Sequence, residues 1–123
     1  MITMILFLCP HGGAKSVIAA AYLSQLLPGE AVAAAAEDPY DAVPAPVVAM
    51  LASEGVDVSD FRPRSVDRRD LERATRIIAI DCDVEGANIE HWNDVPMASV
   101  DLEGSAAAIR RHVEQLAAEL RGH

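Results

Sequence analysis

Two apolar segments dominate the hydrophobic pattern of the chain. Residues 2–8 form a nearly unbroken apolar run that ends abruptly in Cys-Pro-His-Gly-Gly, and residues 75–81 form a β-branched run that leads to Cys82. Short continuous apolar runs bounded by polar residues are typical of strands buried on both faces of a parallel sheet. The pattern therefore predicts two buried strands, each followed by a cysteine at its carboxyl end.

Helical patterns separate and follow these strands. Good helix formers begin at residue 15 and stop before Pro28-Gly29, and an amphipathic pattern runs from residue 104 onward. A further helix is predicted from about residue 44 to Gly55, and Asp67 is predicted to cap a short helical turn. Predicted strands and helices alternate along the chain over short links, as is typical of α/β proteins.

Two weaker segments complete the predicted sheet. Residues 31–36 are a run of small apolar residues, and residues 97–100 are predicted as a last short strand. Strands that alternate with helices predict one α/β domain over residues 1–123, with a parallel sheet between helices on both faces. Ligands of such sheets bind beyond the carboxyl ends of the strands, where Cys9 is expected.

Length and charge narrow the classes of function. A chain of 123 residues with 51% hydrophobic content can bury an ordinary core without metal or disulfide support. Its formal charge of −9 disfavours nucleic-acid and membrane-surface partners, so an anionic ligand needs local positive potential. No apolar run approaches the roughly 18 residues of a membrane span, and the apolar start has neither a basic leader nor a cleavage signal. We therefore predict a cytoplasmic protein.

The supply of reactive side chains is small. Two cysteines, Cys9 and Cys82, are too few for a disulfide framework, and free thiols are the default in a reducing compartment. The histidines at positions 91, 112 and 123 show no metal-ligand spacing, so no metal site is predicted. Among the ten basic residues nine are arginines, and the single lysine is Lys15. These observations direct attention to the segment between Cys9 and Lys15.

The loop after the first predicted strand carries the candidate chemistry. Cys9 lies between a buried strand and a helix start, where unpaired N–H groups and the helix dipole favour negative charge. Such surroundings lower the pKa of a thiol from about 8.5 to roughly 3.5–7.5 in known proteins. Cys9 is therefore predicted to be a thiolate nucleophile, with a buried small residue at a strand end as the alternative.

The rest of this loop is predicted to bind an oxyanion. Gly12 and Gly13 allow successive N–H groups to converge on one concavity. Lys15 adds a positive charge for the bound anion, and Ser16 is placed to donate a hydrogen bond to the thiolate. The predicted anion-binding loop comprises Pro10, His11, Gly12, Gly13 and Ala14. His11 either contacts the anion or is only a polar residue of an exposed loop.

The arrangement strand, Cys-x5-basic-Ser, helix resembles the active-site loop of the low-molecular-weight protein tyrosine phosphatases, a family that includes the thioredoxin-linked arsenate reductases. The resemblance covers essentially the whole chain, with similar segments at residues 51–59, 70–71, 77–81 and 91–96. It implies a four-stranded parallel sheet in the order 2-1-3-4, with strands numbered along the chain. It also implies that Asp94, in the last of these segments, is the general acid that protonates the leaving oxygen.

The resemblance implies an enzyme that uses no cofactor except an external thiol reductant. Cys9 attacks the phosphorus or arsenic of phosphate, arsenate or a phosphoester, and a thioredoxin-like protein or a small thiol is the implied electron donor. Cys82 corresponds to a cysteine in the redox relay of the arsenate reductases. The further relay cysteine is missing near Ile89. A three-cysteine cascade is thus excluded, whereas a two-cysteine or external-thiol version is not.

The chain departs from the family pattern at three places. Lys15 replaces an arginine whose planar fork grips two oxygens, so weaker transition-state stabilisation is expected. His11-Gly12-Gly13 replaces a segment that usually carries a bracing asparagine, and Val95 separates Asp94 from Pro96. Two alternatives therefore stay open, an anion-binding or regulatory module without turnover and a redox sensor built on Cys9 and Cys82. Two residues also have a non-catalytic interpretation. Cys82 is then simply a core residue, and Asp94 is a loop residue that forms a turn with Pro96.

Overall fold

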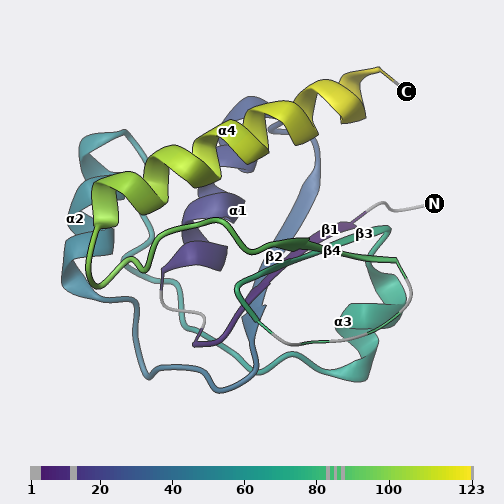
Figure 1. Cartoon of the computed structure of the whole chain (residues 1–123), viewed down its shortest axis with the longest axis horizontal. Coiled ribbons are helices and arrows are strands. Elements are labelled where there is room, and N and C mark those ends of the chain that lie inside the picture. The colour runs from purple at the N-terminus through teal and green to yellow at the C-terminus, as the bar shows by residue number, and fades with distance from the viewer. Residues whose placement is uncertain (1–3, 12–13, 83, 85, 87, 123) are drawn as a thin grey trace.

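One parallel sheet forms the centre of the protein (Figure 1). The structure is a computed structural model that describes residues 4–11, 14–82, 84, 86 and 88–122. Its strands are β1 (Met4–Cys9), β2 (Ala31–Ala36), β3 (Arg76–Ile80) and β4 (Ile89–Trp92). They are all parallel and lie in the order β2-β1-β3-β4, which confirms the predicted topology. The first two residues of the predicted first strand lie outside the described residues.

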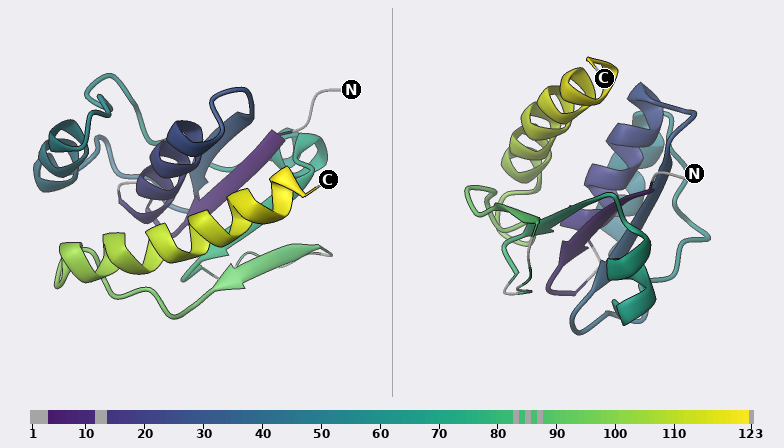
Figure 2. Two further views of the ribbon diagram at one scale, coloured as in Figure 1. Left: turned by 90° about the horizontal axis from the view of Figure 1, so that it is seen from above. Right: turned by 90° about the vertical axis from the view of Figure 1, so that its right-hand side faces the viewer.

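Helices cover both faces of this sheet. Figure 2 shows α1 (Lys15–Leu26) and α4 (Leu102–Arg121) on one side and α3 (Arg68–Arg73) on the other. Helix α2 (Ala45–Ser53) belongs to the side of α1 and α4, because Leu51 is fully buried in the same apolar cluster as Phe7. A smaller cluster around Leu6 and Leu8 lies beneath the opposite face. The chain is thus a three-layer α/β sandwich, as predicted.

The local signals place most elements correctly. Helix α1 begins at Lys15, directly after the candidate loop, and β2 has the predicted bounds. Asp67 caps α3 as predicted, since its carboxylate accepts the N–H of Asp70 at 3.0 Å. The carboxylate of Asp70 in turn accepts the N–H of Asp67 at 3.0 Å, and the pair forms a capping box.

The strand predicted over residues 97–100 is wrong. That segment is a turn whose side chains Met97 and Val100 are 63% and 81% exposed, whereas the fourth strand is Ile89–Trp92. Only the two ends of β4 carry apolar side chains, because β4 is an edge strand with Glu90 and His91 directed to solvent. A half-exposed edge strand has too few apolar positions to be told from a polar loop.

A polar cluster joins α1, α2 and α4 above the sheet. Tyr22 is buried, its hydroxyl donates to Glu54 at 2.9 Å, and the guanidinium of Arg110 lies 4.1 Å from the centre of its ring. Burial, followed by the hydrogen bond to Glu54, raises the pKa of Tyr22. The cluster therefore fixes α4 over α1 with the phenol in its neutral form.

Replacement of Tyr22 by phenylalanine is expected to lower the free energy of unfolding by about 1–2 kcal/mol, because the Glu54 carboxylate loses the hydroxyl that donates to it. The folded state holds the phenol proton more tightly than the unfolded chain. The wild-type protein should therefore lose stability as pH rises above about 10, and Tyr22→Phe should lose less there. Urea unfolding at neutral and alkaline pH measures both effects. Tyr40→Phe, at an exposed tyrosine, is the control, and equal effects of the two variants would contradict the assignment.

No helix in the described part of the chain is both long and apolar enough to cross a membrane.

Candidate active site

Cys9 occupies the last position of β1, where the strand meets α1. Its side chain is buried, and its Sγ lies 3.0 Å from the Oγ of Ser16, which is fully buried in the first turn of α1. When the sulfur is ionised, the hydroxyl is the donor of this hydrogen bond. The N–H groups of a first helical turn have no acceptor within the helix, and their partial positive charge favours an anion beside them. The structure thus places the predicted nucleophile and Ser16 together.

The described part of the loop after Cys9 is braced by the segment that follows β2. The carbonyl oxygens of Pro10 and His11 accept the N–H groups of Asp38 and Tyr40, both at 2.9 Å. The Nδ1 of His11 donates to the carbonyl oxygen of Asp38 at 3.0 Å, and its ring stacks on Tyr40 with the centroids 4.6 Å apart. His11 therefore anchors the loop to the neighbouring segment.

The other predicted members of the anion-binding loop divide into two groups. Ala14 stands at the start of α1, where its carbonyl oxygen accepts the N–H of Ile18 at 2.8 Å. Gly12 and Gly13 lie outside the described residues, so the concavity of N–H groups stays a prediction.

Lys15 is held in an ion pair that the sequence did not reveal. Its side chain is 12% exposed, and its Nζ donates to Oδ2 of Asp81 at 2.5 Å and to the carbonyl oxygen of Val95 at 3.5 Å. Asp81 directly follows β3, the strand beside β1. Since parallel strands end at the same edge of the sheet, a carboxylate in that position was the signal that could have predicted a partner for Lys15.

Asp94 belongs to the segment between β4 and α4, and its side chain is 69% exposed. The Nε2 of His112 donates to its Oδ1 at 2.8 Å, and the imidazole of His112 stacks on Trp92 at 4.6 Å between centroids. This hydrogen bond is the main cause that lowers the pKa of Asp94. The contact between Val95 and Lys15 places this segment beside the candidate site. Asp94 and Cys9 are thus bound to different partners, His112 and Ser16.

The structure does not bring Cys82 to the face of Cys9. Cys82 packs with Leu6 and Leu8 on the α3 side of the sheet, whereas the Sγ of Cys9 faces α1 on the other side. Asp81 explains this placement, because its positive φ of 52° interrupts the alternation of side chains at the end of β3. No disulfide joins the two cysteines.

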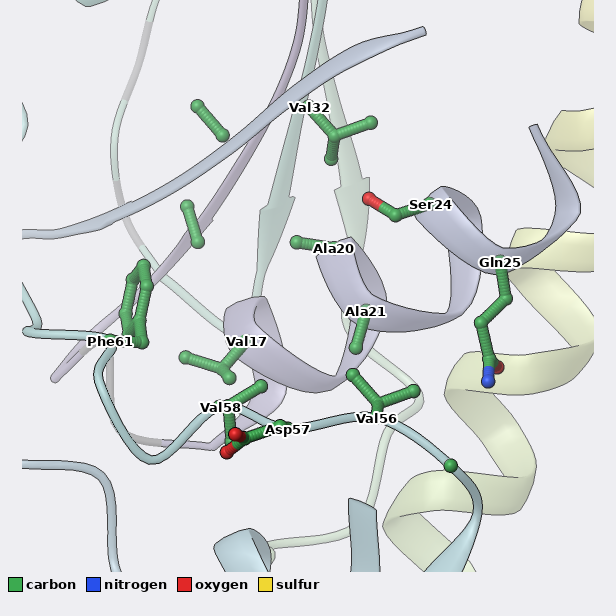
Figure 3. A pocket seen from close by; sticks show the side chains of 13 residues that line it. Val17, Ala20, Ala21, Ser24, Gln25, Val32, Val56, Asp57, Val58 and Phe61 are labelled. Carbon is green, nitrogen blue, oxygen red and sulfur yellow. The ribbon is translucent and has the colours of Figure 1, made fainter. Parts of the chain in front are cut away.

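A separate pocket lies between α1, β2 and the segment after α2 (Figure 3). Its volume is about 430 Å³, and it is bordered by Val17, Ala20, Val32, Val56 and Phe61 among others. None of the predicted site residues that the structure describes lines it, so this pocket does not coincide with the predicted chemistry. Over the described ranges, histidine, cysteine and acidic side chains do not gather in threes as a metal site requires.

Comparison with known proteins bears on the fold. Neither a protein-family model nor a curated protein matches the sequence. Solved structures do match, among them the thioredoxin-dependent arsenate reductase of Corynebacterium glutamicum, at a TM-score of 0.84 and 21% identity. This match covers 98% of the chain but only 62% of the reductase.

Two further matches span nearly the full length of both chains. The low-molecular-weight protein tyrosine phosphatase of Streptococcus pyogenes matches with a TM-score of 0.85 at 13% identity. The match covers 97% of this chain and 93% of the phosphatase. The arsenate reductase of Archaeoglobus fulgidus has a TM-score of 0.76 at 23% identity, with 97% and 99% covered. The sheet order and the enclosing helices agree with these neighbours, and the chain therefore has the α/β fold shared by low-molecular-weight protein tyrosine phosphatases and arsenate reductases.

Proposed function

We propose that this protein is a cysteine-thiolate enzyme that acts on a small tetrahedral oxyanion or a phosphoester. The observation that carries the proposal is the 3.0 Å contact between Cys9 Sγ and Ser16 Oγ at the start of α1. A thiolate there is stabilised by the hydroxyl and by the positive end of the helix. The nearby ammonium of Lys15 supports the binding of an anionic substrate, although Asp81 balances its charge.

The first step on a phosphoester is attack of the Cys9 thiolate on phosphorus. The sulfur–phosphorus bond forms as the phosphorus–oxygen bond breaks, and a proton, supplied by Asp94 in its acid form or by the substrate itself, goes to the leaving oxygen. Water then attacks the phosphocysteine, gives its proton to a carboxylate and releases phosphate with the thiolate restored. Ser16 stabilises the sulfur as the leaving group of this second step.

With arsenate, the same attack expels water and leaves a Cys9–arsenic adduct. A second thiolate attacks the Cys9 sulfur, the sulfur–arsenic electron pair departs with arsenic, and the products are arsenite and a disulfide. Arsenic gains two electrons and the two thiols lose them. Because Cys82 packs on the opposite face of the sheet, we assign the second thiol to an external donor, a thioredoxin-like protein or a small thiol. A further thiolate of the donor then attacks the donor sulfur of this mixed disulfide, which forms the donor's own disulfide and releases the Cys9 thiolate for the next cycle.

Turnover assays with purified protein test this proposal. A chromogenic aryl phosphate reports hydrolysis, and arsenate with thioredoxin, glutathione or dithiothreitol reports reduction. We expect at least one of the two reactions to exceed the rate measured with Cys9→Ser protein. Rates equal to that blank for every substrate and donor would refute the catalytic proposal.

A second candidate function is favoured by the ion pair between Lys15 and Asp81. A neutralised Lys15 stabilises transition-state charge less than an arginine, so the site could serve to bind anions without turnover. Lys15→Arg distinguishes the two functions in the same assays. An enzyme limited by its lysine should gain about tenfold or more in rate, whereas an anion-binding module should show no turnover in either form.

A further inference from the structure

The ammonium of Lys15 has most of its donors occupied. Lysine carries three N–H donors, and contacts with Asp81 Oδ2 and the Val95 carbonyl oxygen account for two of them. At most one N–H is left for a ligand. An anion bound at the start of α1 would therefore meet Lys15 and Asp81 as a unit.

The backbone fixes the carboxylate of Asp81 in this place. The N–H of Asp81 donates to the carbonyl oxygen of Trp92 at 3.1 Å, which extends the pairing of β3 with β4. Its φ of 52° then turns the chain, a conformation that aspartate tolerates better than most residues. Asp81 is thus an anchored acid in contact with Lys15, and its side chain is 26% exposed, whereas that of Lys15 is 12% exposed.

The charges of this unit favour one ionic form of ligand. The Lys15–Asp81 pair is neutral as a whole, so a dianion gains little from the ammonium and is repelled by the carboxylate. A monoanionic oxyanion has half that charge, and its remaining hydroxyl can donate a hydrogen bond to a carboxylate oxygen. Asp81 thus penalises the second negative charge and can accept a hydrogen bond from the hydroxyl that replaces it.

We propose that Asp81 is a specificity-determining residue that makes the site select singly charged tetrahedral oxyanions, namely dihydrogen phosphate, dihydrogen arsenate or the monoanion of a phosphoester. This inference rests on the proposed oxyanion site at Cys9, but not on turnover. The other titratable groups named for this site have partners of their own, and the sulfur of Cys9 is hydrogen-bonded to Ser16 in wild-type protein and Asp81 variants alike. Asp94 is paired with His112, and His11 is bound to the carbonyl oxygen of Asp38.

Binding of two inorganic anions at one pH tests the proposal. At about pH 5.5 the pH is below the second pKa of phosphate groups, which is about 6, so inorganic phosphate is mainly a monoanion. Sulfate has the same tetrahedral shape but is a dianion at this pH. Isothermal titration at constant ionic strength gives both dissociation constants. We expect the wild-type protein to prefer phosphate. Asp81→Asn should tighten sulfate binding about tenfold or more while phosphate binding changes less than about threefold.

Two further variants make the result specific. Asp81→Gly also removes the carboxylate and suits the positive φ, so it covers the case in which the asparagine variant folds poorly. Glu90, on β4, forms an ion pair with Arg76 on β3. Glu90→Gln removes one negative charge there and should leave the preference between the two anions unchanged. An unchanged preference in both Asp81 variants, or an equal change in Glu90→Gln, would overturn the proposal.

The same titrations separate this inference from the proposed enzyme. If the anions bind and Asp81 controls the preference, the inference holds even where no turnover is found. If neither anion binds to the wild-type protein or its Asp81 variants, the oxyanion site itself is refuted and the inference fails with it.

Discussion

Serine in place of Cys9 is expected to abolish hydrolysis of aryl phosphates and reduction of arsenate, with a loss of about 10³-fold or more. The reason is the chemistry of one atom, because sulfur is a far better nucleophile than a hydroxyl oxygen. Serine is close to cysteine in size, and Cys9 is only 3% exposed, so the surrounding packing should be kept. Steady-state rates, with circular dichroism as the check on folding, measure the effect.

The second cysteine provides a matched control. Cys82→Ser makes the same chemical change at a buried thiol on the opposite face of the sheet. Hydrolysis of aryl phosphate should persist in this variant, and so should arsenate reduction with an external thiol. A loss of only arsenate reduction would show that Cys82 is the resolving thiol. Persistent turnover in Cys9→Ser would contradict the mechanism as a whole.

Local sequence signals were sufficient to predict the part of the site whose residues are near one another in the sequence. A buried strand, a loop and a helix start predict that Cys9 and Ser16 lie close together, and the structure shows this contact. The start of α1 and the bounds of β2 follow from the same kind of signal. The order of the strands depends on long-range pairing, and it was available only through the family resemblance. Its confirmation therefore supports that resemblance for the fold.

The remaining features depend on single backbone angles and on tertiary contacts. Alternation along β3 gave no indication that Asp81 would turn to Lys15, because that placement rests on one positive φ after the strand. The same turn separates Cys82 from Cys9. The pairing of Asp94 with His112 joins a loop to a helix 18 residues further on, and no spacing rule covers such a contact.

Asp94→Asn is expected to reduce turnover of phosphoesters with poor leaving groups by about 10²–10³-fold, and much less where the leaving group needs no proton. The pH dependence follows from its partner. A general acid acts only while it is protonated, and the hydrogen bond from His112 lowers the pKa of Asp94. As pH rises, kcat should therefore begin to fall at a lower pH than it would with an unpaired aspartate as the acid.

Removing the partner reverses that shift. His112→Phe keeps an aromatic ring against Trp92 but removes the Nε2 donor, so the pKa of Asp94 should rise and the falling limb should move to higher pH. The pH profiles of kcat for the wild-type protein and His112→Phe measure this shift. In the absence of the Asp94 carboxylate the second change should have no effect, so the profile of the double variant Asp94→Asn/His112→Phe should match that of Asp94→Asn. Coincident wild-type and His112→Phe profiles would show that His112 does not control this proton. If Asp94→Asn also left the rate unchanged, the proton would have to come from a monoanionic substrate, the form that the Lys15–Asp81 pair is proposed to select.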